Sequence, residues 1–241
     1  MTYSVLTIIL WLVGSLGPGS HPSKEDFLAA IASGKVTEVR EMLSADQSLA
    51  SVEATDGTSA LLYAVYQRQP QIVAVLLPYR RTQLTIFESA AVGETARIQA
   101  LLRNDPKLAN ALSRDGFTPL HLASFFGQVD SVELLISAGA NLETHSRNTL
   151  NATPLQSALA AHQLRVAEKL LVNHANPNCR GEEGYTPLFE AAASGQAEAA
   201  ELLLKHGADP SIKGTDGKTA VDVARQAHQS KIEEILSKGA I

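Results

Sequence analysis

Apolar residues recur along the chain in short segments at helical spacing, and glycines separate many of these segments. In residues 115–127 (DGFTPLHLASFFG), leucine and alanine side chains fall on adjoining faces of one short helix, which is predicted to end at Gly127. A second helix is predicted over about residues 129–138, and Gly139 follows where a left-handed backbone conformation is needed. Neither helix can bury its apolar face alone, so the pattern predicts helix pairs that stack on one another.

This two-helix pattern repeats at a nearly constant period. Four aligned threonines, spaced 35, 33 and 33 residues apart, mark it: Thr118, Thr153, Thr186 and Thr219. A second segment repeats at the same period: VELLISAGANLE from Val132, AEKLLVNHANPN from Ala167 and AELLLKHGADPS from Ala200. Weaker copies of the pattern lie upstream, at residues 26–34, 56–68 and 85–93. Two phrases that share one period indicate a repeat protein.

The residues at the start of each first helix explain why the helix begins there. Thr118 is followed by Pro119. The threonine hydroxyl can accept from free backbone N–H groups, and proline suits the first helical turn. The sequence therefore predicts a capped helix start at this point of the repeat.

Together these phrases resemble the ankyrin repeat, whose pattern reads roughly DGxTPLHLAAxxGxxxxVxLLLxxGADxN. The resemblance covers about residues 23–240. It implies an all-α solenoid of stacked helix-turn-helix units with projecting β-turn loops, in about seven repeats. It also implies structural roles for Thr118, Thr153 and Thr186 at helix starts, and for His121, whose imidazole would tie neighbouring turns by hydrogen bonds.

One repeat departs from the pattern. The aligned positions Arg68 and Gly93 lie only 25 residues apart, and the chain between Leu77 and Thr85 reads PYRRTQL. This repeat is expected to lack its projecting turn, so the junction Pro78–Leu84 should leave a gap in the binding groove. The pair Arg80-Arg81 is too small for a nucleic-acid footprint and is interpreted as part of a solvated turn.

The first 22 residues stand apart from the repeats, which are assigned to residues 23–241. An apolar run, Val5–Val13, precedes the linker-like sequence GSLGPGSHPS. The run is shorter than the roughly 20 residues that a membrane helix needs, so no integral span is expected. It fits either the apolar core of a signal peptide, although no Lys or Arg precedes it, or a linker ahead of the fold. A cytoplasmic location is expected, with export as the alternative if residues 1–20 are a signal peptide.

Composition and charge indicate a globular protein and argue against several kinds of partner and site. The chain has 241 residues with 45% hydrophobic and 19% charged residues, which is a globular composition. Its net charge of -5 argues against nucleic acid as a partner. One cysteine excludes an intramolecular disulfide and a four-cysteine zinc site.

No residue pattern favours catalysis. Phosphate-binding, dinucleotide-binding, zinc-protease and serine-hydrolase motifs are absent from the sequence. His174 and Cys179 are five residues apart, but a nucleophilic pair also needs an orienting group and an oxyanion site, which the sequence does not suggest. His174 also replaces the glycine seen at 139 and 207, so strain or a reshaped helix end is expected there. The protein is therefore predicted to be no enzyme and to use no cofactor or metal.

Solenoids of this family bind proteins through the concave surface formed by turn tips and the exposed side of the first helices. Five of the eleven Phe and Tyr residues map to such positions, where the repeat pattern requires no aromatic residue. Aromatic side chains are favoured interface anchors, although Phe125 or Phe126 could instead fill the gap left by the missing turn. The candidate partner-binding residues, with one turn arginine, are Tyr66, Arg114, Phe117, Phe125, Phe126 and Tyr185.

The sequence thus favours a non-catalytic module that binds a protein partner on its concave face, as a monomer. The alternative is an exported or membrane-associated structural or stress-protection protein, which depends on the N-terminal segment alone. The identity of the partner does not follow from the fold, because specificity lies in a few variable surface positions.

Overall fold

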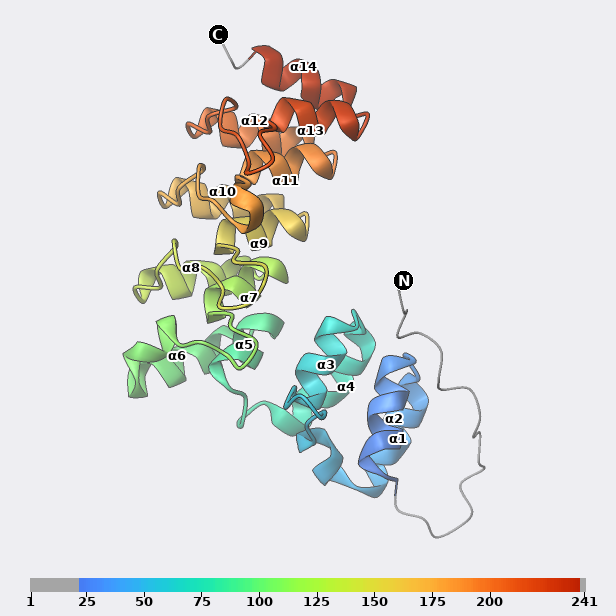
Figure 1. The fold of residues 1–241 in the computed structure, drawn as a ribbon. Coiled ribbons are helices and arrows are strands. Elements are labelled where there is room, and N and C mark those ends of the chain that lie inside the picture. Colours follow the sequence, from blue (N-terminus) through green and yellow to red (C-terminus); the bar gives the residue numbers. More distant parts are fainter. Residues whose placement is uncertain (1–21, 239–241) are drawn as a thin grey trace. The chain divides into compact units, whose positions relative to one another are not determined.

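A computed structural model describes residues 22–238 of the protein (Figure 1). The predicted leader or linker, residues 1–22, lies outside this range except for Pro22. The described residues form α-helices and short 3-10 helices without named strands, which confirms the all-α class. The α-helices are α1 (Lys24–Ala32), α2 (Val36–Ala45), α3 (Ala60–Tyr66), α4 (Pro70–Arg80), α5 (Ile86–Val92), α6 (Thr95–Asn104), α7 (Pro119–Phe125), α8 (Val129–Ser137), α9 (Pro154–Ala160), α10 (Leu164–Val172), α11 (Pro187–Ala193), α12 (Ala197–Lys205), α13 (Ala220–Gln226) and α14 (Ser230–Lys238).

Turns and 3-10 helices connect successive helix pairs. Two short 3-10 helices, η1 (Gln47–Ser51) and η2 (Pro106–Asn110), follow α2 and α6, and the side chains of Asp46 and Asp105 cap them. A third, η3 (Glu182–Gly184), lies in the turn before α11. Isolated β-bridges close two of the turns, Glu53 with Ser59 and Lys213 with Thr219.

The chain divides into two compact units. Unit 1 comprises residues up to 54 together with 58–76, and unit 2 comprises residues 55–57 and those from 77 onward. In unit 2 the first helices α5, α7, α9, α11 and α13 pack side by side in one row, and α6, α8, α10, α12 and α14 form a second row (Figure 1). Apolar residues from both rows fill one continuous core, including Leu120, Leu135 and Leu155. Unit 1 has its own buried residues, among them Phe27 and Leu43.

The short junction is structured differently from the prediction. Helix α4 continues through Pro78 to Arg80, so the junction without a projecting turn is only residues 81–85. Arg80 does not lie in a solvated turn: its side chain is 12% exposed, and one guanidinium nitrogen lies 3.0 Å from a carboxylate oxygen of Glu88. The sequence did not show this pair because Glu88 lies eight residues further on, inside the next helix.

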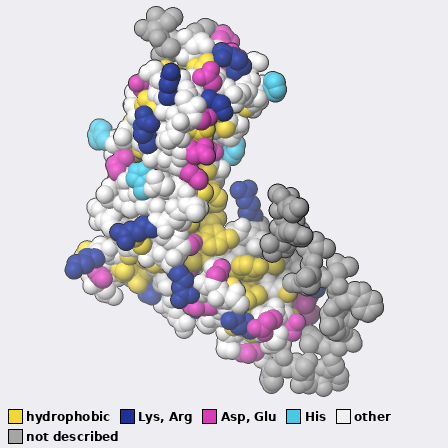
Figure 2. Space-filling model, viewed as in Figure 1, with side chains coloured by type: hydrophobic (Ala, Val, Ile, Leu, Met, Phe, Trp, Pro, Cys, Tyr) yellow, Lys and Arg dark blue, Asp and Glu magenta, His cyan; other side chains and the backbone are white. Residues whose placement is uncertain are grey.

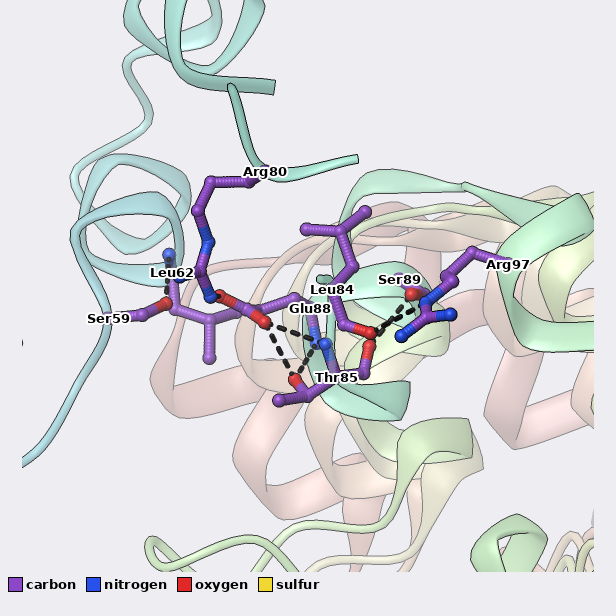
Figure 3. A network of polar contacts seen from close by, with 8 residues as sticks. All are labelled: Ser59, Leu62, Arg80, Leu84, Thr85, Glu88, Ser89 and Arg97. Carbon is purple, nitrogen blue, oxygen red and sulfur yellow. Dashed lines mark hydrogen bonds and ion pairs between the residues drawn. The ribbon is translucent and has the colours of Figure 1, made fainter. Parts of the chain in front are cut away.

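Further side-chain contacts hold the junction against α5 and α6 (Figure 3). Glu88 accepts hydrogen bonds from the backbone N–H and the hydroxyl of Thr85, at 2.8 and 2.9 Å, and the Thr85 hydroxyl accepts from the Glu88 amide. Arg97 donates from Nε to the carbonyl of Leu84 at 2.9 Å. Ionic and capping contacts therefore stabilise this end of unit 2, where the ordinary turn is missing.

Helix ends that carry a residue other than glycine keep the backbone conformation that glycine favours. His174 has φ 69, and Arg68, His162 and His228 show the same left-handed conformation where other repeats have glycine. Hence His174 does not reshape its helix end, as one alternative held. It adopts the strained conformation itself, which is uncommon for a residue with a Cβ atom.

Because repeats in a solenoid contact mainly their neighbours, separate cores should unfold separately. We expect urea denaturation followed by circular dichroism to show two steps, or one step with a reduced slope. Amide hydrogen exchange should be faster over residues 26–77 than over residues 118–204. In unit 1, Phe27→Ala removes a fully buried side chain, a change that typically costs about 3–5 kcal/mol, and should shift only the first step. One steep transition with uniform protection would show that the junction couples like an ordinary one.

Candidate functional site

The end of α7 carries the densest group of the candidate binding residues. Phe125 and Phe126 are half-buried, and their rings meet edge to face with centroids 5.1 Å apart. On the face of unit 2 seen in Figure 2, hydrophobic side chains gather beside α5 and α7. Edge-to-face contact is a favoured arrangement of aromatic rings, so this pair offers an apolar surface at the end of a first helix.

Phe117 and Arg114 lie in the turn that leads into α7. The Phe117 ring is half-buried and lies 5.9 Å from the His121 ring. Arg114 is exposed but engaged, because one of its guanidinium nitrogens donates to the carbonyl of Asp56 at 3.0 Å. Asp56 belongs to the 55–57 segment of unit 2, so this hydrogen bond lies within unit 2.

Contacts with neighbouring residues fix the side chain of Tyr185. Its ring stacks on Phe189 at 4.6 Å with an interplanar angle of 11°, and its hydroxyl donates to Asp216 at 3.1 Å. A Cβ atom at Gly214 would lie only 2.3 Å from the Tyr185 ring. Tyr185 therefore links its own turn to the next one, and part of its ring remains accessible.

The remaining aromatic candidate belongs to the other unit. Tyr66 is the last residue of α3 in unit 1 and is 37% exposed. The other five candidates lie in unit 2. The structure therefore brings Phe125 and Phe126 into contact with each other, and it places Tyr66 in a separate unit.

Of the three threonines expected to have structural roles at helix starts, Thr118 and Thr153 cap their helices and Thr186 does not. Thr118 and Thr153 accept from the backbone N–H of the third residue of α7 and α9, while the side chain of that residue bonds back to the threonine N–H. Thr186 is equally buried, but its hydroxyl has no hydrogen-bond partner among the described residues. The assumption that all three starts are alike was wrong for this hydroxyl, because the third residue of α11 is Phe189, which has no polar atom to reciprocate.

His121 ties two turns together. The Thr118 amide donates to Nδ1 at 3.2 Å, so the neutral ring carries its proton on Nε2, which lies 2.8 Å from the carbonyl of Ala152. Burial lowers the His121 pKa from 6.5 to about 4, and the hydrogen bond to Ala152 opposes this only in part. The imidazole is therefore neutral near pH 7 and acts as a structural hydrogen-bonding group.

Cys179 is placed for packing. Its thiol is buried and lies 3.2 Å from the Thr153 hydroxyl. Burial raises its pKa to about 11, so the thiol is protonated at neutral pH and is a poor nucleophile. His174 is exposed at the end of α10, and no hydrogen bond joins it to Cys179 in the described part of the chain.

Residues 22–238 contain no group of three or more His, Cys, Asp or Glu side chains arranged to hold a metal ion. Over the same residues, no helix combines the length and the apolar character that crossing a membrane requires.

Sequence reasoning missed three surface features. Leu150 and Val172 are 52% and 58% exposed, and Leu150 lies at the tip of a turn that is two residues longer than its neighbours. Glu190 is half-buried on α11, at an aligned position where Ser89, Leu122 and Ser157 are buried. The sequence offered a signal for Glu190, because the aligned residues of the other repeats are uncharged.

A stack of short helix pairs joined by projecting turns defines an α-helical repeat protein. A family model described as "Ankyrin repeats (3 copies)" matches residues 28–146, 86–179 and 155–240, which together cover most of the chain. The chain belongs to the ankyrin repeat family. Ankyrin repeats are general protein–protein interaction modules, and the fold is typically non-catalytic.

Three curated proteins show the range of molecules that contain similar repeats. The chain is 36% identical over 94 residues to the serine/threonine-protein kinase VIK of Arabidopsis thaliana, a match that covers 39% of this chain and 20% of the kinase. It is 32% identical over 110 residues to the human DNA-binding protein RFXANK, covering 45% and 42%. It is 31% identical over 121 residues to a transient receptor potential cation channel subfamily A member 1 homolog of Caenorhabditis elegans, covering 50% and 9%. The chain therefore spans less than half the length of each of these relatives.

Proposed function

We propose that the protein is a non-catalytic module that holds a protein partner on its concave face, formed by the turns and the first helices. The observation that carries this proposal is the half-buried Phe125–Phe126 pair at the end of α7, with half-buried Phe117 in the turn before the helix. Partly accessible aromatic rings offer large contact area at low entropic cost, which favours them as anchors. The name of the human relative refers to DNA, but the net charge of -5 of this chain favours a protein partner.

Alanine substitution tests this surface. The partner would first be captured on the immobilised full chain and identified, and its affinity measured for the wild type and for Phe117→Ala and Phe125→Ala. Truncation of an interface hot spot costs about 2 kcal/mol or more, so Phe125→Ala should weaken binding roughly 30-fold while helicity is unchanged.

A matched control lies on the other row of helices. Val172 is 58% exposed at the end of α10, and Val172→Ala removes apolar surface away from the first helices. The control should bind the partner like the wild type. Undiminished binding by both phenylalanine variants would refute the concave-face proposal, as would an equal loss in Val172→Ala.

A further inference from the structure

A carboxylate occupies a position on the first helices that other repeats keep uncharged. Glu190 is the fourth residue of α11, and the aligned residues of α5, α7 and α9 are Ser89, Leu122 and Ser157. Those three side chains are buried, whereas Glu190 and the aligned Val223 of α13 are half-buried. Removing a carboxylate from water is costly unless a cation or hydrogen-bond donor compensates it, so this substitution calls for a physical explanation.

No such compensation is present among the described residues. Among the described residues the Glu190 carboxylate takes part in no ion pair, and the Ser194 hydroxyl and amide donate instead to the Glu190 backbone carbonyl, at 2.5 and 3.1 Å. Neither carboxylate oxygen belongs to the fully buried, unpartnered atoms of this part of the chain, so both remain reachable. Burial raises the Glu190 pKa, and the charge of exposed His162 opposes this in part. The carboxylate is thus partly dehydrated, without a protein partner and accessible.

The first-helix residues near Glu190 have small side chains. Ala160 and Ala193, at the ends of α9 and α11, are exposed and small, and Ser194 follows on the same turn. The α9 helix packs against both α7 and α11, so the Phe125–Phe126 pair lies two helices away from Glu190 in the same row.

We propose that Glu190 is a specificity-determining residue that receives a Lys or Arg side chain of the bound partner. This inference rests on the proposed function and names the partner chemistry: a segment that presents an apolar residue to Phe125 and a basic residue to Glu190. A cation would offset the dehydration of the carboxylate, and a charge-assisted hydrogen bond is stronger than a neutral one.

The spacing of the helices sets the spacing of the two recognition elements. Packed helices lie about 8–10 Å apart, so two steps from α7 to α11 cover roughly 16–20 Å. An extended chain advances about 3.3 Å per residue, so the apolar and basic residues should be separated by about five or six residues.

Peptide selection tests the inference without knowledge of the natural partner. A library of random peptides of about twelve residues would be selected on the immobilised full chain near pH 7.5. We expect enrichment of Lys or Arg about five or six residues from an aromatic or aliphatic residue. Glu190→Gln, which removes the charge and keeps the shape, should weaken the selected peptides about tenfold or more.

An exposed glutamate provides the control. Glu201 lies on α12, in the row of second helices, so Glu201→Gln changes the net charge equally and should leave affinity unchanged. Peptides that depend on Phe125 but bind Glu190→Gln as well as the wild type would overturn this inference and leave the proposed function standing. Failure to select any peptide that depends on Phe125 would overturn both.

Discussion

Replacing Glu88 by alanine should cause the largest loss of stability among single substitutions at the junction. Glu88 is 1% exposed and Arg80 is 12% exposed, so the substitution leaves a guanidinium with little water around it and no carboxylate. Breaking a buried ion pair on one side typically costs about 3–5 kcal/mol. Loss of the cap that Glu88 shares with Thr85 adds about 1 kcal/mol. Urea denaturation followed by circular dichroism measures the change.

Two further variants separate the causes of this loss. Glu88→Gln removes the charge but keeps an acceptor for Thr85, as Gln156 does for Thr153 in α9, so it isolates the ion pair. Glu94→Ala breaks the nearby pair with Arg81, which is 64% exposed, and should cost no more than about 1 kcal/mol. If Glu88→Ala were as mild as Glu94→Ala, the buried pair would not stabilise the junction.

The second large effect is a loss of folding stability at acidic pH, caused by protonation of His121. His121 has a pKa of about 4 in the folded protein, against 6.5 for an ordinary histidine, so the unfolded chain binds a proton at higher pH than the folded chain does. Stability is therefore complete above pH 6.5 and falls as the pH drops toward 4. At 1.36 kcal/mol per pKa unit, the free energy of unfolding should decrease by about 2 kcal/mol between about pH 7.5 and about pH 5 through this group alone.

Glutamine variants assign this dependence to one residue. Gln156, at the aligned position of α9, accepts from the Thr153 amide and donates to the carbonyl of Tyr185. His121→Gln should therefore keep the bonds to Thr118 and Ala152, and its stability should change less than that of the wild type between the two pH values. His228→Gln replaces an exposed histidine and should keep the wild-type dependence. An unchanged pH dependence in His121→Gln would show that another group is responsible. The lowered pKa of Asp222 acts in the same direction but at lower pH, in the carboxyl range, and the raised pKa of Glu190 acts in the opposite direction, so the difference between wild type and His121→Gln is what assigns the dependence to His121.

Much of the fold could be predicted because its determinants are local in sequence. Thr118 and Pro119 begin α7 through contacts within four residues, and Gly127 and Gly139 end α7 and α8 where φ is positive. A constant period then requires neighbouring helix pairs to stack, whatever their surface residues are. The candidate site could be predicted only in part. Position in the repeat identified the turn and first-helix residues, but it did not show how deeply each side chain is buried.

Hydrophobic period, caps and turn residues are local in sequence, so they are enough to specify the family, the order of the helix pairs and the place of the irregular junction. The partners of the polar groups became known only from the folded arrangement. Arg80 finds Glu88, Arg114 reaches Asp56, Tyr185 stacks on Phe189 and reaches Asp216, and Glu190 is left without a partner among the described residues. The reason is physical. The burial of a side chain and the atoms within its reach depend on residues of neighbouring repeats, often thirty or more positions away, and the repeat pattern leaves those residues free to vary.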